Sequence, residues 1–369
     1  MNASRCVFVL AGPSGGHLFP AWSFAESLRT KRLSCRIVLL TGERAKKLGT
    51  PLEQGPFDSV YYSKDFHGFS LNPWRFLGVL ANAVVAFFQA WRWICREKPC
   101  LAAGFGSYVS CPGVVLAYCF KIPILLHEQN KIAGKATRFL LPLARELASS
   151  FEGTVPEPGR GKPWTVTGLP IQRPLIEAAA NFERIYDKTC LTWLVVGGSQ
   201  GALRLNALVL ETIRLFSPEE RGKIAVIHIT GTQDFEKVTA AYHGLKISAQ
   251  TYPFFDKMYE LFAQADFALT RAGANTLFEL ALFGVPAMVI PYPHAGAHQK
   301  ENAAAFVKQG ALICEEESKM NPDYLLRLVQ IFLKDSALRK NLSDKIRTLA
   351  NPSAGERLAE MACAVVEAL

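Results

Sequence analysis

The sequence predicts an α/β fold with two domains, each built on a parallel sheet, that face a ligand cleft. Two glycine-rich turns, at residues 12–17 and 197–202, each follow a short apolar strand and precede a helical segment. They begin at 12 and 197, so they lie 185 residues apart, half of the 369-residue chain. This length suits about two domains, and the repeated design indicates that both have βα architecture.

The first domain is expected to open with a strand, a loop, a helix and a second strand. Cys6–Leu10 is a continuous apolar run that predicts a buried strand. The glycine turn follows, and Pro20–Arg29 is predicted to be a helix with proline in its first turn. Cys35–Thr41 is the next apolar strand. This order is typical of a parallel βαβ unit.

The second domain repeats the same order of elements. Strands are predicted at Leu191–Val196 and Ile224–Thr230, and a helix at Leu203–Phe216 follows the glycine turn between them. Between the domains, Gly153–Pro163 is rich in Pro and Gly and poor in apolar residues. We therefore expect a linker there.

The segment Phe76–Cys95 is almost entirely apolar. Polar residues at 75, 82, 89 and 96 recur every seven residues, so they share one stripe of a helix. Charges interrupt the run too often for a membrane-spanning helix. Two interpretations remain: a core helix with one wetted edge, which the pattern alone favours, or a helix that packs inward on one side and contacts lipid with Trp91, Trp93 and the Phe residues.

Charge and cysteine content limit the function classes. The formal net charge of +9 and the pI near 9.1 favour anionic partners: nucleic acid, phosphorylated substrates or an acidic membrane surface. The nine cysteines include no Cys-x-x-Cys pair, which argues against a zinc site or a disulfide framework and fits a reducing cytoplasm. The N-terminal apolar run is shorter than we expect for a signal peptide.

The first glycine turn, Gly12-Pro-Ser-Gly-Gly-His17, lets a backbone approach an anion at the start of a helix. Its spacing differs from the dinucleotide fingerprint G-x-G-x-x-G. His17 is expected at the junction of loop and helix, where it can act as a general base. The alternative is that it caps or packs the loop.

Two later segments suit a nucleotide diphosphate. In the second turn Ser199 can donate to a phosphate, or it is a surface residue of a tight turn. In Thr270–Glu279 a helix is predicted to start near Asn275, where a diphosphate would meet its N-terminus. Glu279 can then accept hydrogen bonds from a ribose diol, or it is an exposed carboxylate near the positive end of the helix dipole.

Polar residues also follow two other predicted strands. His127-Glu-Gln-Asn130 follows Ile122–Leu126, and His298-Gln299 follows Ala287–Pro291 and a loop. Ligand sites of α/β proteins lie at such carboxyl ends. The chain contains no Asp-x-Asp motif for a metal-held diphosphate, so helix N-termini and cations would neutralise the anion.

Taken together these segments resemble one family. The order GGHxxPA, GFGSYVSCPG, LLHEQNxxAG, GGSQGA, RAGAxTxxE and HQxxNA, from about Val7 to about Val365, closely resembles the MurG family of glycosyltransferases. The resemblance implies a GT-B fold with two Rossmann-like domains facing a cleft. We expect an N-terminal domain at 1–165 on the acceptor and membrane side, a UDP-GlcNAc domain at 166–345, and a C-terminal helix at 346–369 that returns to the first domain.

The resemblance also implies an activity. The family transfers GlcNAc from UDP-GlcNAc to the MurNAc 4-hydroxyl of lipid I, with inversion, and forms lipid II for peptidoglycan synthesis. Partners are then UDP-GlcNAc, lipid I, an anionic membrane surface, and cell-wall and division proteins, with no nucleic acid. The protein would be peripheral on the cytoplasmic face of the inner membrane, which now favours lipid contact by Trp91 and Trp93. No metal or other cofactor is required, although divalent ions can stimulate.

Carried over residue by residue, the resemblance implies His17 as the base and Tyr108 and Glu128 on the acceptor side. The family's arginine near the donor is displaced to Arg173 or replaced by Gln172. In the family, uracil contacts the backbone at a position with an aliphatic side chain, and this chain has Phe255 at that position. The implied UDP-GlcNAc contacts are Ser14, Gly15, Gly16, Asn130, Arg173, Ser199, Phe255, Ala274, Asn275, Thr276, Glu279 and Gln299.

Three other functions remain as alternatives. One is another UDP-sugar-dependent glycolipid transferase of the same fold, and donor and acceptor assays would separate it. The second is a cell-wall scaffold protein without turnover, against which the intact His17, Asn130 and Glu279 argue. The third is a nicotinamide-dependent dehydrogenase, which the glycine spacing disfavours.

Overall fold

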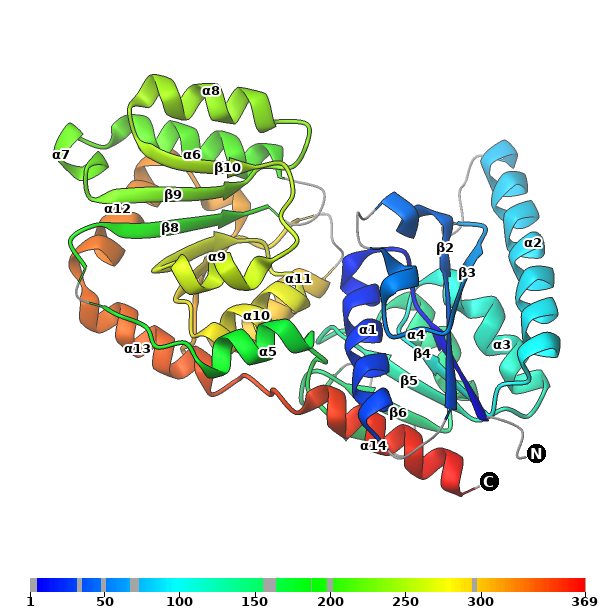
Figure 1. Ribbon diagram of the computed structural model, residues 1–369. Helices are drawn as coiled ribbons and strands as arrows, with labels where there is room; N and C mark the ends of the chain where they lie inside the picture. Colours follow the sequence, from blue (N-terminus) through cyan, green and yellow to red (C-terminus); the bar gives the residue numbers. More distant parts are fainter. Residues whose placement is uncertain are drawn as a thin grey trace. The chain divides into compact units, whose positions relative to one another are not determined.

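The computed structural model describes residues 5–31, 35–47, 51–66, 73–154, 164–186, 188–197, 202–293 and 297–368. The chain forms two compact units (Figure 1). The first unit comprises Met1–Arg173 together with Asn351–Leu369, and the second comprises Pro174–Ala350. The divisions fall at 173/174 and 350/351, whereas the sequence predicted 165/166 and 345/346. Predicted linker residues 155–163 lie outside the described part of the chain.

The first unit contains a seven-stranded parallel sheet in the order β3-β2-β1-β4-β5-β6-β7. The chain runs from β1 outward to β3 and then crosses back to β4, on the other side of β1. The topological switch point of the sheet therefore lies between β1 and β4. The strands are β1 Arg5–Leu10, β2 Cys35–Gly42, β3 Ser59–Ser63, β4 Leu101–Gly104, β5 Ile124–Glu128, β6 Glu146–Ser149 and β7 Trp164–Val166.

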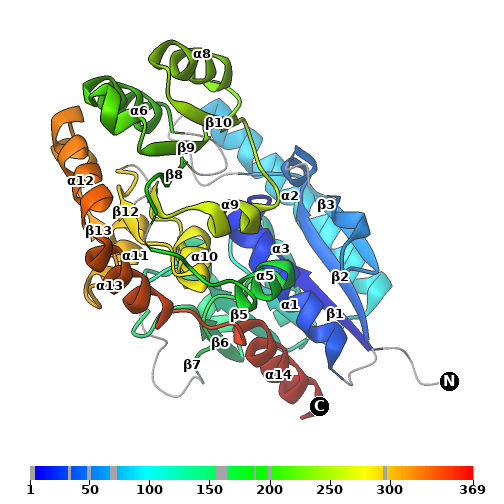
Figure 2. The ribbon, with the colours of Figure 1, turned by 60° about the vertical axis from the view of Figure 1, so that its left-hand side comes forward.

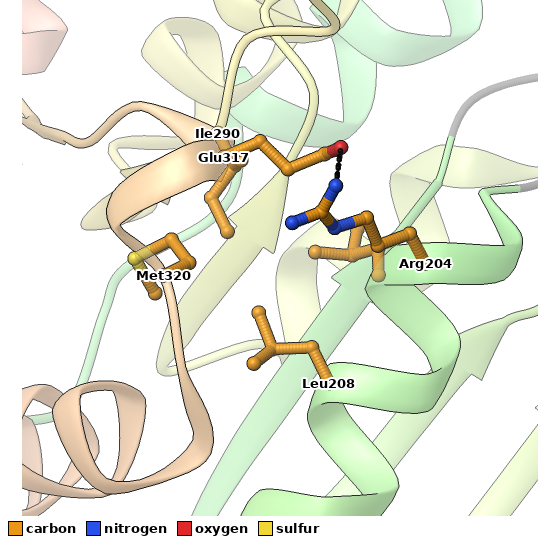
Figure 3. Close-up of a pocket in the computed structure, with 6 residues that line it drawn as sticks. Arg204, Leu208, Ile290, Glu317 and Met320 are labelled. Carbon is orange, nitrogen blue, oxygen red and sulfur yellow. Dashed lines mark ion pairs between the residues drawn. The ribbon is translucent and has the colours of Figure 1, made fainter.

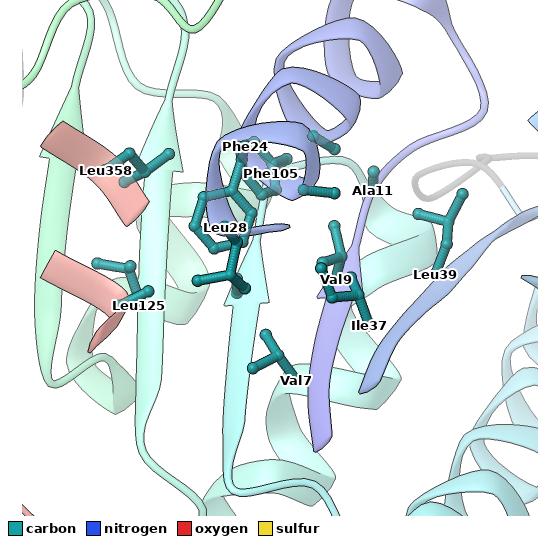
Figure 4. Packing of buried hydrophobic residues seen from close by; sticks show 14 of the residues in the cluster. Val7, Val9, Ala11, Phe24, Leu28, Ile37, Leu39, Phe105, Leu125 and Leu358 are labelled. Atoms are coloured by element: carbon teal, nitrogen blue, oxygen red, sulfur yellow. The ribbon is translucent and has the colours of Figure 1, made fainter. Parts of the chain in front are cut away.

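Both faces of this sheet are covered by helices, so alternate residues of β1 enter two cores. Val7 and Val9 pack on the side of α1 and α14, while Phe8 and Leu10 pack on the side of α2 and α3. Figure 4 shows the first of these cores, with Leu358 of α14 in the same cluster. The helices of the unit are α1 Gly15–Thr30, α2 Pro73–Glu97, α3 Cys111–Cys119, α4 Lys135–Leu140 and α14 Ala354–Glu367. Helix α5, Arg173–Ala180, begins at the division, so all but its first residue belong to the second unit.

Helix α1 begins five residues earlier than predicted. Both His17 N (3.0 Å) and Leu18 N (2.9 Å) donate to Ser14 O, so Gly15, Gly16 and His17 form its first turn. Pro20 therefore lies inside the helix and not in its first turn. The prediction was wrong because two consecutive glycines indicate a loop, although glycine can adopt helical angles at a modest cost.

Helix α14 lies against α1 in the first unit (Figure 2). Gly355 allows this close approach: a Cβ atom there would lie 2.6 Å from Ser27 Oγ. Lys31 Nζ and Glu360 Oε1 form an ion pair of 2.9 Å between the two helices. The last helix of the chain thus completes the core that the first helix begins.

The second unit repeats the strand order with six parallel strands, β10-β9-β8-β11-β12-β13. Trp193 of β8 is fully buried and stacks on Phe267 of β11 at 5.9 Å. The strands are β8 Leu191–Val196, β9 Ile224–Ile229, β10 Ser248–Tyr252, β11 Phe267–Thr270, β12 Ala287–Val289 and β13 Ile313–Cys314. The helices are α6 Leu203–Leu215, α7 Pro218–Arg221, α8 Phe235–Leu245, α9 Met258–Gln264, α10 Ala274–Phe283, α11 His298–Val307, α12 Pro322–Lys334 and α13 Ser336–Arg347.

Candidate active site

His17 lies in a slot at the carboxyl end of the first unit's sheet. Its ring nitrogen Nδ1 is 2.8 Å from the carbonyl oxygen of Phe105, the residue that follows β4. Two glycines make room for the ring, because a Cβ at Gly12 would lie 2.8 Å from His17 Cδ2 and one at Gly106 would lie 3.3 Å from Cε1. A neutral imidazole that donates from Nδ1 carries its lone pair on Nε2. The geometry therefore assigns the tautomer that a general base needs.

Two of the four residues in His127-Glu-Gln-Asn130 belong to strand β5 and do not follow it as predicted. His127 is buried, and its Nε2 lies 3.2 Å from the carbonyl oxygen of Gly168. Burial lowers the pKa of His127 to about 4, so the ring is neutral at physiological pH. This histidine is therefore part of the folded core.

The Glu128 carboxylate organises the loop after β5. One oxygen accepts hydrogen bonds from the backbone N–H (3.0 Å) and side-chain amide (3.1 Å) of Asn130, and the other accepts from Gly134 N–H (3.0 Å). Glu128 is only 1% exposed, so these bonds offset its desolvation. Asn130, predicted to contact UDP-GlcNAc, is thus held in place by Glu128, which was predicted on the side of the sugar acceptor. Tyr108, the other predicted acceptor residue, is half-buried at the start of the short helix η3, Tyr108–Ser110.

The remaining predicted contacts of the first unit lie at two places. Ser14 and Gly16 are exposed and Gly15 is buried, all at the start of α1. Arg173 is exposed, is the last residue of the first unit, and begins α5 with its N–H 3.4 Å from Glu26 Oε2.

In the second unit, α10 begins at Ala274, one residue before the predicted start. Gly273 precedes it and has no side chain that could cap the helix. Ala274, Asn275 and Thr276 form the first turn, whose N–H groups point towards the carboxyl edge of the sheet. This places the positive end of the helix dipole where a diphosphate was predicted.

Glu279 lies in the second turn of α10 and is half-buried. Loss of contact with water raises the pKa of its carboxyl group to about 7. A buried carboxylate that is costly to ionise gains most from hydrogen-bond donors that a ligand brings. A raised carboxyl pKa is also a common property of functional sites.

Gln299 and Asn302 hold the turn before α10. The side-chain oxygen of Gln299 accepts from Ala272 N–H (3.1 Å) and Tyr292 N–H (2.8 Å), and the amide of Asn302 donates to Ala272 O (3.2 Å). Both lone pairs of the Gln299 oxygen therefore accept from backbone N–H groups, so any contact with the sugar would come from the NH₂ group of Gln299. Asn302 was not predicted as a site residue, although it lies in the HQxxNA segment.

A pair of ionic contacts with one carboxylate joins this turn to the start of α6. Arg271, buried directly before Ala272, forms an ion pair with Glu317, and Arg204 of α6 reaches the same carboxylate at 3.3 Å (Figure 3). A cavity of about 30 Å³ lies beside it, with room for about one or two water molecules and none for a sugar nucleotide. The cavity is lined by Arg204, Leu205, Leu208, Ile290, Glu317 and Met320.

Phe255 and Ser199 are the two other predicted donor contacts of the second unit. Phe255 is half-buried between β10 and α9 and packs against Tyr252 with ring centroids 4.7 Å apart. Ser199 lies outside the described residues, as do its neighbours 198–201. Among the residues that the structure describes, no three His, Cys, Asp or Glu side chains form a group able to hold a metal ion.

Helix α2 exposes its apolar side and turns polar side chains towards the protein. Gln89 Oε1 accepts from Lys64 N–H (3.1 Å), and Asn82 donates to Asp65 O (3.4 Å). By length and composition alone, Leu77–Glu97 could cross a membrane (mean hydropathy 1.3). Only 17% of this stretch is buried, whereas a core helix would be mostly buried. The exposed apolar residues of α2 are Leu77, Leu80, Val84, Val85, Phe87, Phe88 and Trp91, and we call this surface the α2 face.

The two tryptophans predicted to contact the membrane point in different directions. Trp91 is 45% exposed on the α2 face. Trp93 is half-buried against the sheet and stacks on Tyr61 of β3, with centroids 4.9 Å apart and rings 7° from parallel. Residues two apart on a helix lie about 200° apart, so both could not share one face. Trp93 therefore lies on the inner side of α2, and we keep the prediction of lipid contact for Trp91.

Comparison with known proteins identifies the class. Residues 7–149 match the glycosyltransferase family 28 N-terminal domain, and residues 192–358 match the glycosyltransferase family 28 C-terminal domain. With its two parallel sheets of the same strand order, the chain is a glycosyltransferase with the GT-B fold.

Full-length relatives narrow the class. The chain is 34% identical over 365 residues (98% of each chain) to the UDP-N-acetylglucosamine–N-acetylmuramyl-(pentapeptide) pyrophosphoryl-undecaprenol N-acetylglucosamine transferase of Cupriavidus pinatubonensis. It is 33% identical to the enzyme of that name from Nitrosococcus oceani, over 96% of this chain and 97% of that protein. The crystal structure of Acinetobacter baumannii MurG matches with a TM-score of 0.74 and 27% identity, covering 99% and 100% of the two chains. The chain belongs to the MurG family.

Proposed function

We propose that this protein transfers GlcNAc from UDP-GlcNAc to the MurNAc 4-hydroxyl of lipid I and so forms lipid II for peptidoglycan synthesis. The observation that carries the proposal is the end-to-end relationship, at 34% identity over 98% of the chain, to transferases named for this donor and acceptor. The proposal is also supported by Ser14, Asn130 and Ala274, which follow β1, β5 and β11 at the carboxyl ends of parallel strands, where α/β proteins bind ligands.

The reaction would be a single displacement with inversion. The acceptor oxygen forms a bond to the anomeric carbon as the bond from that carbon to the UDP oxygen breaks. His17 Nε2 takes the proton of the acceptor hydroxyl. Before the reaction, the hydrogen bond from Nδ1 to Phe105 O holds the proton of the neutral ring on Nδ1, so Nε2 carries the lone pair. UDP leaves as an anion.

The leaving group would be stabilised by the second unit. The first turn of α10, at Ala274–Thr276, offers backbone N–H groups to the diphosphate, and Gln299 and Asn302 hold the preceding turn in place. Glu279 would accept hydrogen bonds from the ribose hydroxyls. Helix N-termini stabilise an anion without a metal ion, so we propose that the reaction requires none.

We also propose that the protein is peripheral on the cytoplasmic face of the inner membrane and docks through the α2 face. The first unit has 22 basic and 13 acidic residues, whereas the second has 19 of each, so the first unit carries the whole net charge of +9. An exposed apolar stripe beside basic residues suits an anionic lipid surface. Because Ala86, Ala90 and Ile94 bury the other side of α2, the helix would lie along the membrane surface.

Product analysis tests the proposed function. The purified protein is incubated with UDP-GlcNAc and a lipid I analogue, and the product is identified by mass spectrometry and by the configuration of the new linkage. A β-linked GlcNAc–MurNAc product supports the proposal. Parallel reactions with UDP-galactose, UDP-glucose and diacylglycerol test the rival glycolipid transferase, and preference for one of these would overturn it. An intact fold without any turnover would favour the scaffold protein.

A further inference from the structure

One backbone carbonyl in the first unit accepts hydrogen bonds from two side chains. The oxygen of Phe105 is 2.8 Å from His17 Nδ1 and 3.1 Å from Gln129 Nε2. A carbonyl oxygen has two lone pairs, so both donors can bind it at once. Gln129 is 3% exposed, and its amide nitrogen also lies 3.3 Å from His127 O and 3.4 Å from His127 Nδ1. Gln129 therefore donates to this carbonyl oxygen from inside the core, and His17 donates to it from the side of the candidate site.

The backbone after this carbonyl has an unusual conformation. Gly106 has φ +80° and Ser107 has φ +75°. Glycine adopts such angles freely, but a residue with a side chain does so at a cost of about 1–2 kcal/mol. Ser107 also packs tightly, because a Cβ at Gly12 would lie 2.4 Å from Ser107 Cβ. Strain of this kind persists only where surrounding contacts fix the backbone.

The position of the carbonyl decides what His17 can do. If the ring turned by half a rotation about its Cβ–Cγ bond, carbon atoms would replace Nδ1 and Nε2. If the proton moved to Nε2, the lone pair would point at the carbonyl. A fixed acceptor for Nδ1–H excludes both arrangements.

We propose that Gln129 is a positioning residue for His17: it fixes the Phe105 carbonyl, and that carbonyl selects the ring orientation and tautomer with the lone pair on Nε2. The inference rests on the proposed function, in which His17 removes the acceptor proton. Gln129 itself touches neither substrate. The effect passes through one peptide group, so its loss weakens catalysis without removing the base.

The variant Gln129→Met tests this because it keeps the length of the side chain and loses the donor. We expect kcat to fall about tenfold while KM for UDP-GlcNAc changes less than about twofold. In protein labelled with ¹⁵N-histidine, the wild type should show His17 protonated at Nδ1, with the signal assigned by its loss in His17→Asn. The variant should show a mixture of tautomers. Gln129→Leu, which also lacks a donor, is the second variant if the Met variant does not fold.

Thr154→Val is the matched control. It also removes one buried side-chain hydrogen bond to a carbonyl of the same unit, from Thr154 Oγ1 to Phe151 O (2.9 Å), away from His17. Unchanged His17 signals in the Gln129 variants, or a loss of kcat no larger than that of the control at equal thermal stability, would overturn the proposal. If the wild type transfers no GlcNAc, the proposed function fails, and the tautomer comparison alone then decides the role of Gln129.

Discussion

The two units share a strand order and differ in their surfaces. The first carries the entire net charge of +9, and the second is neutral. Seven of the eighteen exposed large apolar side chains among the described residues lie on α2 of the first unit, and those of the second unit are scattered over several elements. The same architecture thus presents a charged, partly apolar surface in one unit and an ordinary solvated one in the other. This difference suits a lipid-borne acceptor for the first unit and a soluble nucleotide donor for the second.

The largest expected effect tests whether the chemistry belongs to the first unit. His17→Ala should lower turnover by about a hundred- to ten-thousand-fold, the usual contribution of a general base. UDP affinity, which we assign to the second unit, should change little. His17→Asn keeps a hydrogen-bonding group without a base and should be nearly as poor. Steady-state kinetics and calorimetry measure both quantities. A largely active Asn variant would mean that the base lies elsewhere.

The next effect tests whether donor binding belongs to the second unit. Glu279→Ala removes the carboxylate proposed to bind the ribose and should cost about 1.5–3 kcal/mol of UDP-GlcNAc affinity, or roughly 10- to 150-fold. Turnover at saturating donor should change less than affinity. Glu219→Ala, which removes a carboxylate that is 81% exposed in the same unit, serves as the control. Equal calorimetric affinities for all three proteins would remove Glu279 from the site.

A smaller effect separates the two sides of α2. Replacing Phe88 and Trp91 with Ser should lower binding to anionic vesicles by about tenfold or more, because two aromatic side chains lose contact with lipid. The thermal stability should stay close to that of the wild type. Trp93→Ser, on the inner side, should instead destabilise the first unit. Sedimentation with vesicles and thermal unfolding measure these effects, and equal vesicle binding by the double variant and the wild type would rule out the α2 face as the docking surface.

A fourth effect concerns the cost of ionising the half-buried carboxyl group of Glu279. The pKa of Glu279 is raised from 4.5 to about 7 in the folded chain, so folded protein binds more protons than unfolded protein between these values. The contribution of Glu279 to stability is therefore present at pH 4.5 and lost as the pH rises through 7. Relative to wild type, Glu279→Gln should gain up to about 2 kcal/mol by pH 8, less than the full shift because the carboxylate is partly exposed. Denaturant unfolding at pH 4.5 and 8 without ligand measures this, and equal differences at both would contradict it.

The smallest expected effect is the response to chelator. Because helix N-termini are proposed to stabilise the leaving diphosphate, turnover should persist in excess EDTA, with at most modest stimulation by added Mg²⁺. The measurement compares initial rates with and without chelator. Abolition by EDTA and restoration by Mg²⁺ would show that a metal ion is required.

Much of the fold could be predicted because the relevant signals are local. Leu191–Val196 was predicted to the residue, and Cys6–Leu10 to within one residue, since each is an apolar run bounded by turn-forming or polar residues. The start of α10 was predicted to within one residue because Gly273 precedes it. The family resemblance then supplied the order of the loops.

The errors arose where tertiary contacts override the local pattern. Strand β5 continues through His127 and Glu128 because both side chains find partners: the carbonyl of Gly168, after β7, accepts from His127, and Asn130, in the loop after β5, donates to Glu128. No periodicity of the sequence reveals these partners. The polar stripe of α2 suggested a wetted edge, yet Gln89 turns inward because backbone N–H of the segment after β3 needs an acceptor. The roles of Glu317 and Gln129 depend on partners 46 and 24 residues away in sequence and leave no mark on their own segments.

The return of α14 to the first unit has a consequence for biosynthesis. The core of that unit includes Leu358, Ala359, Ala362 and Val365, which leave the ribosome only after the whole of Pro174–Ala350. At about 5–20 residues per second, translation of the second unit delays them by roughly ten to thirty seconds. The second unit, which is continuous in sequence, can therefore complete its fold first, while the nascent first unit keeps the apolar side of α1 uncovered. The N-terminal half of this chain is the part most in need of a chaperone during translation.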